Sequence, residues 1–234
     1  MSAEGGFRHV AVTGSSSGIG RAIVEALLAE GWAVSGLDVA PAAVSHAAFT
    51  HVPVDLARGE DIARAAALLP PLDALVHAAG VLRVGPLGQL DHAGGELMWR
   101  LHVDGATRLA DALVPAMAAR GAGRVVFIGS RVAQGMAGRG QYAATKAALV
   151  ALARSWAAEV APRGVTINVV SPAATQTAML DDPARAASTP RLPPIGRLIQ
   201  PGEIAALVGY LLSPAAAAIT GQDIAICGGS SLNR

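Results

Sequence analysis

The sequence predicts an α/β protein built on a parallel sheet. Two observations carry this prediction: short runs rich in β-branched residues alternate with longer alanine-rich stretches, and the apolar residues of those stretches recur at helical spacing. Strands that alternate with helices form βαβ units, in which the strands run parallel. No linker, repeat or change of composition interrupts the alternation, so we expect residues 1–234 to form one domain.

The individual elements follow from the same patterns. Seven runs have the length and composition of buried strands: 9–12, 33–37, 51–54, 74–77, 124–128, 166–170 and 223–226. Five stretches are expected to be helices: 21–30, 60–69, 97–119, 141–159 and 203–212. Gly31 and Gly121 follow two of these stretches, where helix C-caps are expected. Segment 181–201 holds five of the 14 prolines and shows little periodicity, which predicts a lid-like loop.

Composition excludes several classes of protein. Hydrophobic residues make up 52% of the chain and charged residues 15%, which is typical of a folded domain. The net charge is +1 with both signs interspersed, so no field exists to hold a nucleic acid. No apolar stretch reaches the roughly 20 residues that span a membrane. With no secretory leader and one cysteine, Cys227, the chain is expected to be soluble and cytoplasmic, and no metal site is expected.

A glycine-rich turn follows the first predicted strand and opens the first helix. Its sequence is Thr13-Gly-Ser-Ser-Ser-Gly-Ile-Gly20. Glycines at 14, 18 and 20 allow a tight turn and let a pyrophosphate approach the helix N-terminus, where free N–H groups favour negative charge. A dinucleotide site is therefore predicted here; a glycine turn with no ligand is the alternative.

Asp38 ends the second predicted strand, where a carboxylate can accept both hydroxyls of an adenosine ribose. This carboxylate would repel a 2′-phosphate, and no Arg or Lys lies in the turn before Gly20 or directly after Asp38. We therefore expect NAD(H) in preference to NADP(H), the alternative being an aspartate that merely closes a turn. Asp55, past the third strand, either bonds the adenine amino group or caps a helix.

Lys146 is the only lysine in a chain with 17 arginines. It lies four residues after Tyr142 on a predicted helix, so both side chains share one face. An ammonium group nearby stabilises a phenolate, which predicts an acid/base able to work closer to neutral pH. Ser130, at the end of the fifth strand, can donate a hydrogen bond to a substrate oxygen. The alternative is a lysine retained by chance.

Four motifs together resemble the classical short-chain dehydrogenase/reductase family: the glycine turn, Ser130, Tyr142-(x)3-Lys146 and Asn168-Val-Val-Ser-Pro172. The resemblance covers essentially the whole chain. It implies a Rossmann fold, that is, a doubly wound seven-stranded parallel sheet with helices on both faces. It also implies hydride transfer between a small-molecule secondary alcohol or its ketone and nicotinamide, and a homotetramer or homodimer built on two long helices.

The resemblance also assigns roles to residues. Tyr142 is the acid/base, Lys146 lowers the pKa of Tyr142 and holds the nicotinamide ribose, and Ser130 orients the substrate. The positions expected to bind the cofactor are Gly14, Ser16, Gly18, Ile19, Gly20, Asp38, Asp55, Leu56, Ala79, Gly80, Tyr142, Lys146, Pro172, Thr175 and Thr177.

The chain departs from the family pattern at three places. His77-Ala-Ala-Gly80 replaces the family's N-N-A-G, and Ala173 replaces a glycine. His102 occupies the place of an asparagine that anchors a proton-relaying water. Two interpretations of His102 stay open: it relays protons as a catalytic residue in place of that asparagine, or it is a buried, satisfied histidine.

Three arginines and two further segments bear on the substrate. Arg83, Arg131 and Arg139 are expected at the substrate mouth, which favours a carboxylate or phosphate; solvated surface arginines are the alternative. Segments 73–83 and 219–232 resemble the 2,3-dihydro-2,3-dihydroxybenzoate dehydrogenase branch, which implies a cyclic or carboxylated alcohol. Two further functions stay open. One is a 3-oxoacyl thioester reductase, disfavoured by Asp38 because such reductases usually take NADPH. The other is a non-catalytic NAD-sensing protein on the same fold.

Overall fold

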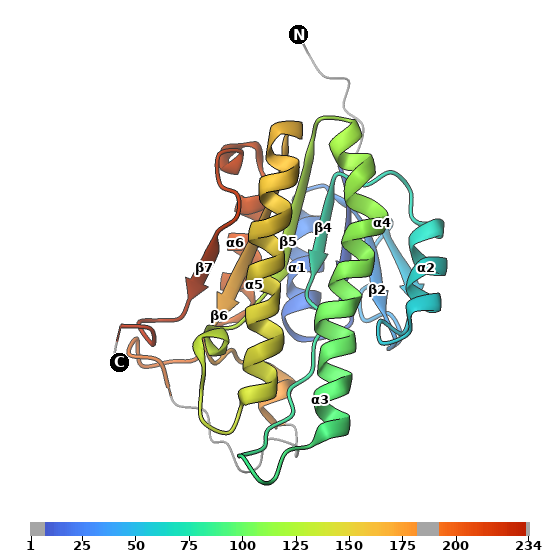
Figure 1. Cartoon of the computed structure of the whole chain (residues 1–234). Helices are drawn as coiled ribbons and strands as arrows, with labels where there is room; N and C mark the ends of the chain where they lie inside the picture. Colours follow the sequence, from blue (N-terminus) through green and yellow to red (C-terminus); the bar gives the residue numbers. More distant parts are fainter. Residues whose placement is uncertain (1–7, 182–191, 233–234) are drawn as a thin grey trace.

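A computed structural model describes residues 8–181 and 192–232. These residues form a parallel seven-stranded sheet in the order β3-β2-β1-β4-β5-β6-β7, with helices on both faces (Figure 1). The predicted doubly wound α/β fold is confirmed.

The strands agree with the predicted runs to within two residues at each end. They are β1 (His9–Thr13), β2 (Ala33–Asp38), β3 (Phe49–Pro53), β4 (Ala74–His77), β5 (Gly123–Ile128), β6 (Val165–Pro172) and β7 (Asp223–Ile226). The α-helices are α1 (Gly18–Ala29), α2 (Gly59–Leu68), α3 (His92–Trp99), α4 (Gly105–Ala119), α5 (Gly140–Val160) and α6 (Pro201–Leu212). Short 3-10 turns are η2 (Arg131–Gln134), η3 (Ala161–Arg163), η4 (Ala178–Asp181) and η6 (Pro214–Ala216).

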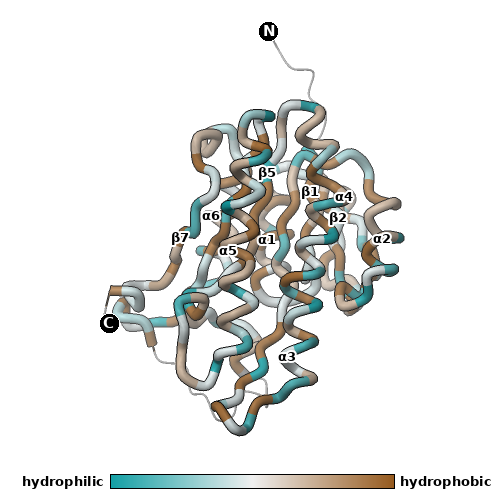
Figure 2. Tube along the Cα trace, in the orientation of Figure 1, coloured by the Kyte–Doolittle hydropathy of each residue, from teal (hydrophilic) through white to brown (hydrophobic). Residues whose placement is uncertain are grey.

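Two hydrophobic cores lie on the two faces of the sheet. Along β1, Val10 and Val12 pack with α1 and α6, whereas Ala11 between them packs with α2, α4 and α5. Successive strand residues point to opposite faces, so a strand covered on both faces must be apolar throughout. Figure 2 shows this as hydrophobic strands enclosed by helices of mixed character.

The stretch predicted as one helix over 97–119 is divided in the structure. α3 begins earlier, at His92, where the Asp91 side chain accepts a hydrogen bond from Gly94 N at 2.8 Å. Residues 100–104 then form a π-helical turn, η1 (Arg100–Asp104), before α4 begins. The prediction of a continuous α-helix was therefore wrong, because apolar spacing does not reveal one extra residue in a turn. π-Turns inside α-helices occur frequently at functional sites.

The strand order reverses direction between β1 and β4. The chain runs from β1 outward through β2 and β3, then returns to β4 on the other side of β1. In such sheets ligands bind in the crevice at the carboxyl ends of the two strands where the order reverses. Thr13 and His77, which end β1 and β4, are paired there.

The predicted lid over 181–201 is described only in part, since residues 182–191 lie outside the described residues. Beyond them, Ile195 N donates to Gly228 O at 3.1 Å, and Ile199 bridges to Thr175. The later part of this segment is therefore held against the ends of β6 and β7. Within residues 8–181 and 192–232, no helix is both long enough and apolar enough to cross a membrane.

Candidate active site

A cavity of about 770 Å³ opens at the carboxyl ends of the central strands. It is lined from the segments that follow β1, β4, β5 and β6. The predicted site residues in its lining are Gly14, Gly18, Ile19, Gly20, Ala79, Gly80, Ser130, Arg131, Arg139, Tyr142, Lys146, Pro172, Thr175 and Thr177. Those outside its lining are Ser16, Asp38, Asp55, Leu56, Arg83 and His102. One cavity thus brings together most residues that the motifs singled out.

The glycine turn fits a closely approaching anion. Gly14 has a φ of 67°, and a Cβ added to it would lie 2.9 Å from the backbone of Ala79. A Cβ on Gly20 would lie 2.1 Å from the carbonyl oxygen of Gly14. At the start of α1, Ser17 makes no side-chain cap and the first turn has no acidic residue. The free N–H groups and the positive helix dipole therefore suit a pyrophosphate.

Asp38 lies beside this turn, at the end of β2. Its two carboxylate oxygens accept hydrogen bonds from Ser16 N and Ala40 N, both at 2.9 Å. The carboxylate is thereby oriented next to the glycine turn, and each oxygen keeps a lone pair for a ribose hydroxyl. Asp55 accepts from Ala57 N at 2.9 Å, and the N-cap of α2 is Arg58, so Asp55 does not cap that helix.

Thr13 and His77 join the two strands at the crevice. Thr13 Oγ1 accepts hydrogen bonds from Ala78 N and Ala79 N, each at 3.0 Å, so its own proton points to His77 Nδ1 at 3.1 Å. His77 is therefore neutral and protonated at Nε2. Burial, and secondly the charge of Lys146, lower its pKa to about 3. Sequence reasoning did not single out Thr13, although its place directly before Gly14 was a signal.

The catalytic candidates converge from β5 and α5. Lys146 Nζ donates to the carbonyl oxygen of Ile128 at 2.8 Å and lies 5.8 Å from the centre of the Tyr142 ring. The Lys146 side chain is buried, and burial lowers its pKa to about 7. Ser130 Oγ accepts from Val132 N at 3.2 Å, which leaves its hydroxyl proton for a substrate oxygen. The arrangement can move a proton at a substrate oxygen near neutral pH.

His102 lies behind this pair, in the π-turn. Its ring is edge-on to that of Tyr142, with centres 5.7 Å apart. Thr145 Oγ1 gives its proton to the carbonyl oxygen of Tyr142 at 2.8 Å, so His102 Nδ1 must donate to Thr145 Oγ1 at 2.9 Å. His102 Nε2 in turn accepts from Val81 N at 3.0 Å. The imidazole is therefore neutral, with both nitrogens engaged.

These contacts favour the buried, satisfied histidine over the proton relay. Burial, followed by the charges of Lys146 and His77, holds the pKa of His102 well below its ordinary value. A relay would have to break a bond to Thr145 or Val81 at each step. We therefore propose that His102 acts as a positioning residue that joins the loop after β4 to α5.

The three arginines expected at the substrate mouth separate in the structure. Arg131 and Arg139 line the cavity, whereas Arg83 does not. The Arg83 guanidinium donates to the Leu82 carbonyl at 3.0 Å, and its side chain packs close to Gly94 at the start of α3. Of the three arginines, Arg131 and Arg139 thus belong to the described lining of the larger cavity, and Arg83 lies beside it in sequence, directly after the lining residue Leu82.

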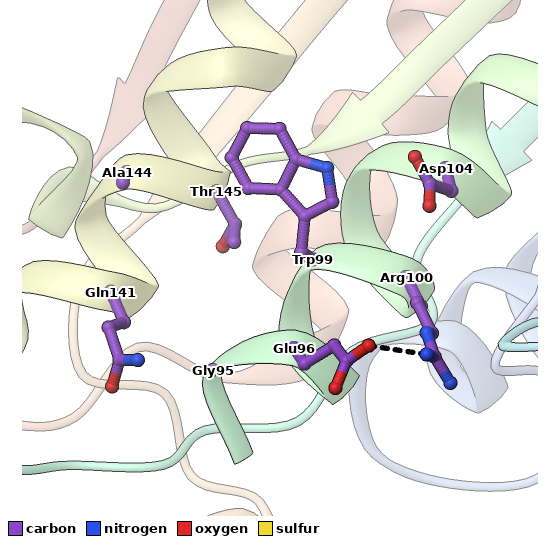
Figure 3. Close-up of a pocket in the computed structure, with 8 residues that line it drawn as sticks. All are labelled: Gly95, Glu96, Trp99, Arg100, Asp104, Gln141, Ala144 and Thr145. Carbon is purple, nitrogen blue, oxygen red and sulfur yellow. Dashed lines mark hydrogen bonds and ion pairs between the residues drawn. The ribbon is translucent and has the colours of Figure 1, made fainter. Parts of the chain in front are cut away.

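A second cavity, of about 420 Å³, shares no lining residue with the first. Its walls come from α3 with η1 and from the segment 141–145 of α5 (Figure 3). In its wall, Glu96 and Arg100 form an ion pair with each other, which Figure 3 marks with a dashed line. Because the Tyr142 and Lys146 side chains belong to the larger cavity, that cavity is the candidate active site.

Comparison with known proteins identifies the family. The family model described as enoyl-(acyl carrier protein) reductase matches residues 14–231. A solved structure described as a short chain dehydrogenase/reductase family protein superposes with a TM-score of 0.86 at 33% identity, covering 96% of this chain and 97% of that one. The chain belongs to the short-chain dehydrogenase/reductase family.

Two relatives extend this result. 3-Oxoacyl-(acyl-carrier-protein) reductase FabG of Vibrio harveyi is 36% identical, over 93% of this chain and 95% of the relative. The 2,3-dihydro-2,3-dihydroxybenzoate dehydrogenase of Escherichia coli (strain K12) is 35% identical, over 96% of this chain and 97% of the relative. This short-chain dehydrogenase/reductase is accordingly an oxidoreductase that acts on CH–OH groups.

The hydrogen bonds of His102 lead to a prediction that separates positioning from relay. Replacing His102 by Ala leaves Val81 N without its acceptor and removes the hydrogen bond that Thr145 Oγ1 accepts, so we expect the free energy of unfolding to fall by about 2–4 kcal/mol. Turnover should fall, while the midpoint of the pH–rate profile stays within about half a unit, because a neutral imidazole does not titrate in this range. Denaturant titration and steady-state rates over pH measure the two effects.

Thr145→Val is the matched control, since it removes the proton acceptor of His102 and keeps the ring and the side-chain shape. It should weaken stability and turnover in the same direction. If the midpoint of the pH–rate profile moved by a full pH unit in His102→Ala but not in Thr145→Val, the result would favour His102 as a proton relay and contradict the positioning role.

Proposed function

We propose that this short-chain dehydrogenase/reductase interconverts a secondary alcohol and its ketone with NAD(H) as the cofactor. The observation that carries the proposal is the buried ammonium of Lys146 beside Tyr142, in a cavity that also holds Ser130 and the glycine turn. A site that only sensed a dinucleotide would not need a cation buried against a phenol.

The chain offers a place for each part of the cofactor. The N–H groups at the start of α1 would hold the pyrophosphate, Asp38 the adenosine ribose and Lys146 the nicotinamide ribose. The chemistry that a bound nicotinamide supplies is hydride transfer.

The protein's own part is to hold the substrate oxygen and to move its proton. In alcohol oxidation, the Ser130 hydroxyl donates a hydrogen bond to the substrate oxygen, and the Tyr142 phenolate accepts the hydroxyl proton. The Lys146 ammonium stabilises that phenolate. In ketone reduction the same groups act in reverse, with the Tyr142 phenol donating its proton to the oxygen.

The cofactor preference rests on one carboxylate. A 2′-phosphate would place two negative charges against Asp38, and like charges brought together cost several kcal/mol. In the glycine turn before Gly20 and directly after Asp38, the sequence offers no Arg or Lys to offset that charge. We therefore propose NAD(H) in preference to NADP(H).

A 3-oxoacyl thioester reductase is a second candidate, favoured by the similarity to the Vibrio harveyi protein that bears this name. It uses the same proton-transfer residues and differs only in what is attached to the ketone.

The first test asks whether Tyr142 carries the chemistry. We expect NAD-dependent turnover, followed by absorbance at 340 nm, with a member of a panel of cyclic dihydrodiols, carboxylated alcohols and plain secondary alcohols, or of 3-oxoacyl thioesters in reverse. Tyr142→Phe should lower the rate by about 10²–10⁴-fold, because it removes the group that accepts and donates the proton. Tyr210→Phe is the matched control, since Tyr210 is the chain's other tyrosine and lies on α6 outside the cavity lining. No turnover with any member despite tight NADH binding would favour a sensor.

The second test concerns Asp38. We expect kcat/KM with NAD to exceed that with NADP by about 100-fold or more, and Asp38→Ala to narrow this ratio to about tenfold or less, because the repulsion is removed. Asp55→Ala is the comparison: it should change kcat/KM with both cofactors by a similar factor. A wild-type preference for NADP would refute the proposed role of Asp38.

A further inference from the structure

Arg131 is a charged side chain for which the proposed reaction has no use. It is partly buried, lines the active-site cavity and directly follows Ser130. Its guanidinium makes no hydrogen bond or ion pair with any other residue that the structure describes. A guanidinium carries five N–H donors, and those of Arg131 stay available to a ligand in the cavity.

The charge of the cavity lining is one-sided. Among the described residues, Lys146, Arg131 and Arg139 line it, and no aspartate or glutamate does. Burial lowers the pKa of Lys146 to about 7, so this lysine loses its charge as the pH rises above neutral. The two arginines stay positively charged over that range. A lining whose described charged residues are all cations attracts an anion, and low-dielectric walls strengthen that attraction.

The position of the two arginines separates them from the cofactor's phosphates. The pyrophosphate is expected at the glycine turn, after β1, whereas Arg131 lies in η2 after β5 and Arg139 is the residue before α5. η2 packs against α5, and in the sequence both arginines lie between Ser130 and Tyr142. Both arginines therefore line the same cavity as Ser130 and Tyr142, the residues proposed to contact the reacting oxygen.

The neighbouring lining is apolar. Leu82, Val132 and Met136 line the same cavity and offer no side-chain charge. A guanidinium presents a planar fork of donors that matches a carboxylate or a phosphate. The lining therefore combines an anion-binding pair with an apolar wall.

We propose that the substrate carries an anionic group, a carboxylate or a phosphate, on a small apolar body, and that Arg131 and Arg139 bind this group. The proposal rests on the proposed function for the reaction that the substrate undergoes, but anion binding itself can be measured without turnover. Arg131 is then the residue that determines specificity for charged over neutral alcohols.

The experiment compares probes that differ in charge. Calorimetric titration of the NADH-loaded protein, at constant ionic strength in phosphate-free buffer, measures the Kd of cyclohexanecarboxylate, cyclohexyl phosphate and the neutral cyclohexanecarboxamide. We expect at least one anion to bind about tenfold more tightly than the amide, since charge-assisted pairs of this kind are worth about that much or more. In Arg131→Gln this preference should fall to about threefold or less.

Arg64→Gln is the matched control, because Arg64 is an exposed arginine on α2 that pairs with Asp61 and does not line the cavity. It should keep the full preference. Tight binding of the phosphate alone, or of the carboxylate alone, supports the proposal and identifies the anion.

Three results would overturn the proposal: neither anion bound more tightly than the amide, a preference unchanged in Arg131→Gln, or an equal loss of NADH affinity in that variant, which would assign Arg131 to the cofactor. Loss of the proposed reaction would look different. A protein that prefers anions but shows no Tyr142-dependent turnover would keep the anion site and refute the proposed function.

Discussion

The burial of one ammonium group constrains the rest of the active site. Lys146 lies inside the protein at the start of α5, with the Ile128 carbonyl as a hydrogen-bond acceptor, and its pKa is lowered to about 7 because burial disfavours the charged form. A negatively charged phenolate at Tyr142 would attract the Lys146 ammonium and so favour the protonated, charged form of the lysine. Lys146 Nζ lies 5.8 Å from the centre of the Tyr142 ring; at about that separation and an effective dielectric constant of about 20, two unit charges attract by about 3 kcal/mol, or about two pKa units. The two groups therefore share a proton that is released near neutral pH.

The groups around this cation are arranged so that they add no charge. His77 and His102 are both buried, and each is held neutral by hydrogen bonds that leave a single tautomer. A charged imidazole at either place would oppose the Lys146 ammonium, which is one cause of the low pKa of both histidines. The two neutral rings instead connect separate segments of the chain through hydrogen bonds. His77 connects β4 to the end of β1, and His102 connects the π-turn to the loop after β4 and to α5. At the centre, a Cβ on Gly80 would lie 3.0 Å from His102 Nε2 and 3.6 Å from Lys146 Nζ.

Much of this arrangement could be predicted from the sequence. The strands are apolar on both faces and so are visible as continuous runs, and the glycine turn and the pair Tyr142 and Lys146 follow local rules of spacing. The π-turn could not be predicted, because one extra residue in a turn leaves the helical pattern around it intact. The roles of Thr13 and Thr145 as hydrogen-bond centres depend on contacts between segments far apart in sequence. Arg83 and Arg131 are both arginines followed by a valine, so the local sequence does not distinguish them. Tertiary packing places Arg131 in the described cavity lining and Arg83 outside it.

The central claim is that burial of Lys146 sets the pH at which Tyr142 exchanges a proton with the substrate. The most direct measurement is the pH dependence of kcat/KM for alcohol oxidation in wild type and in Lys146→Met. The active form must have lost one proton from the pair, so the wild-type rate should rise with pH through a midpoint near 7, and reduction should fall through the same range. Without the ammonium, Tyr142 must ionise alone, and the midpoint for oxidation should move up toward about 10. The same midpoint in both proteins would contradict the account.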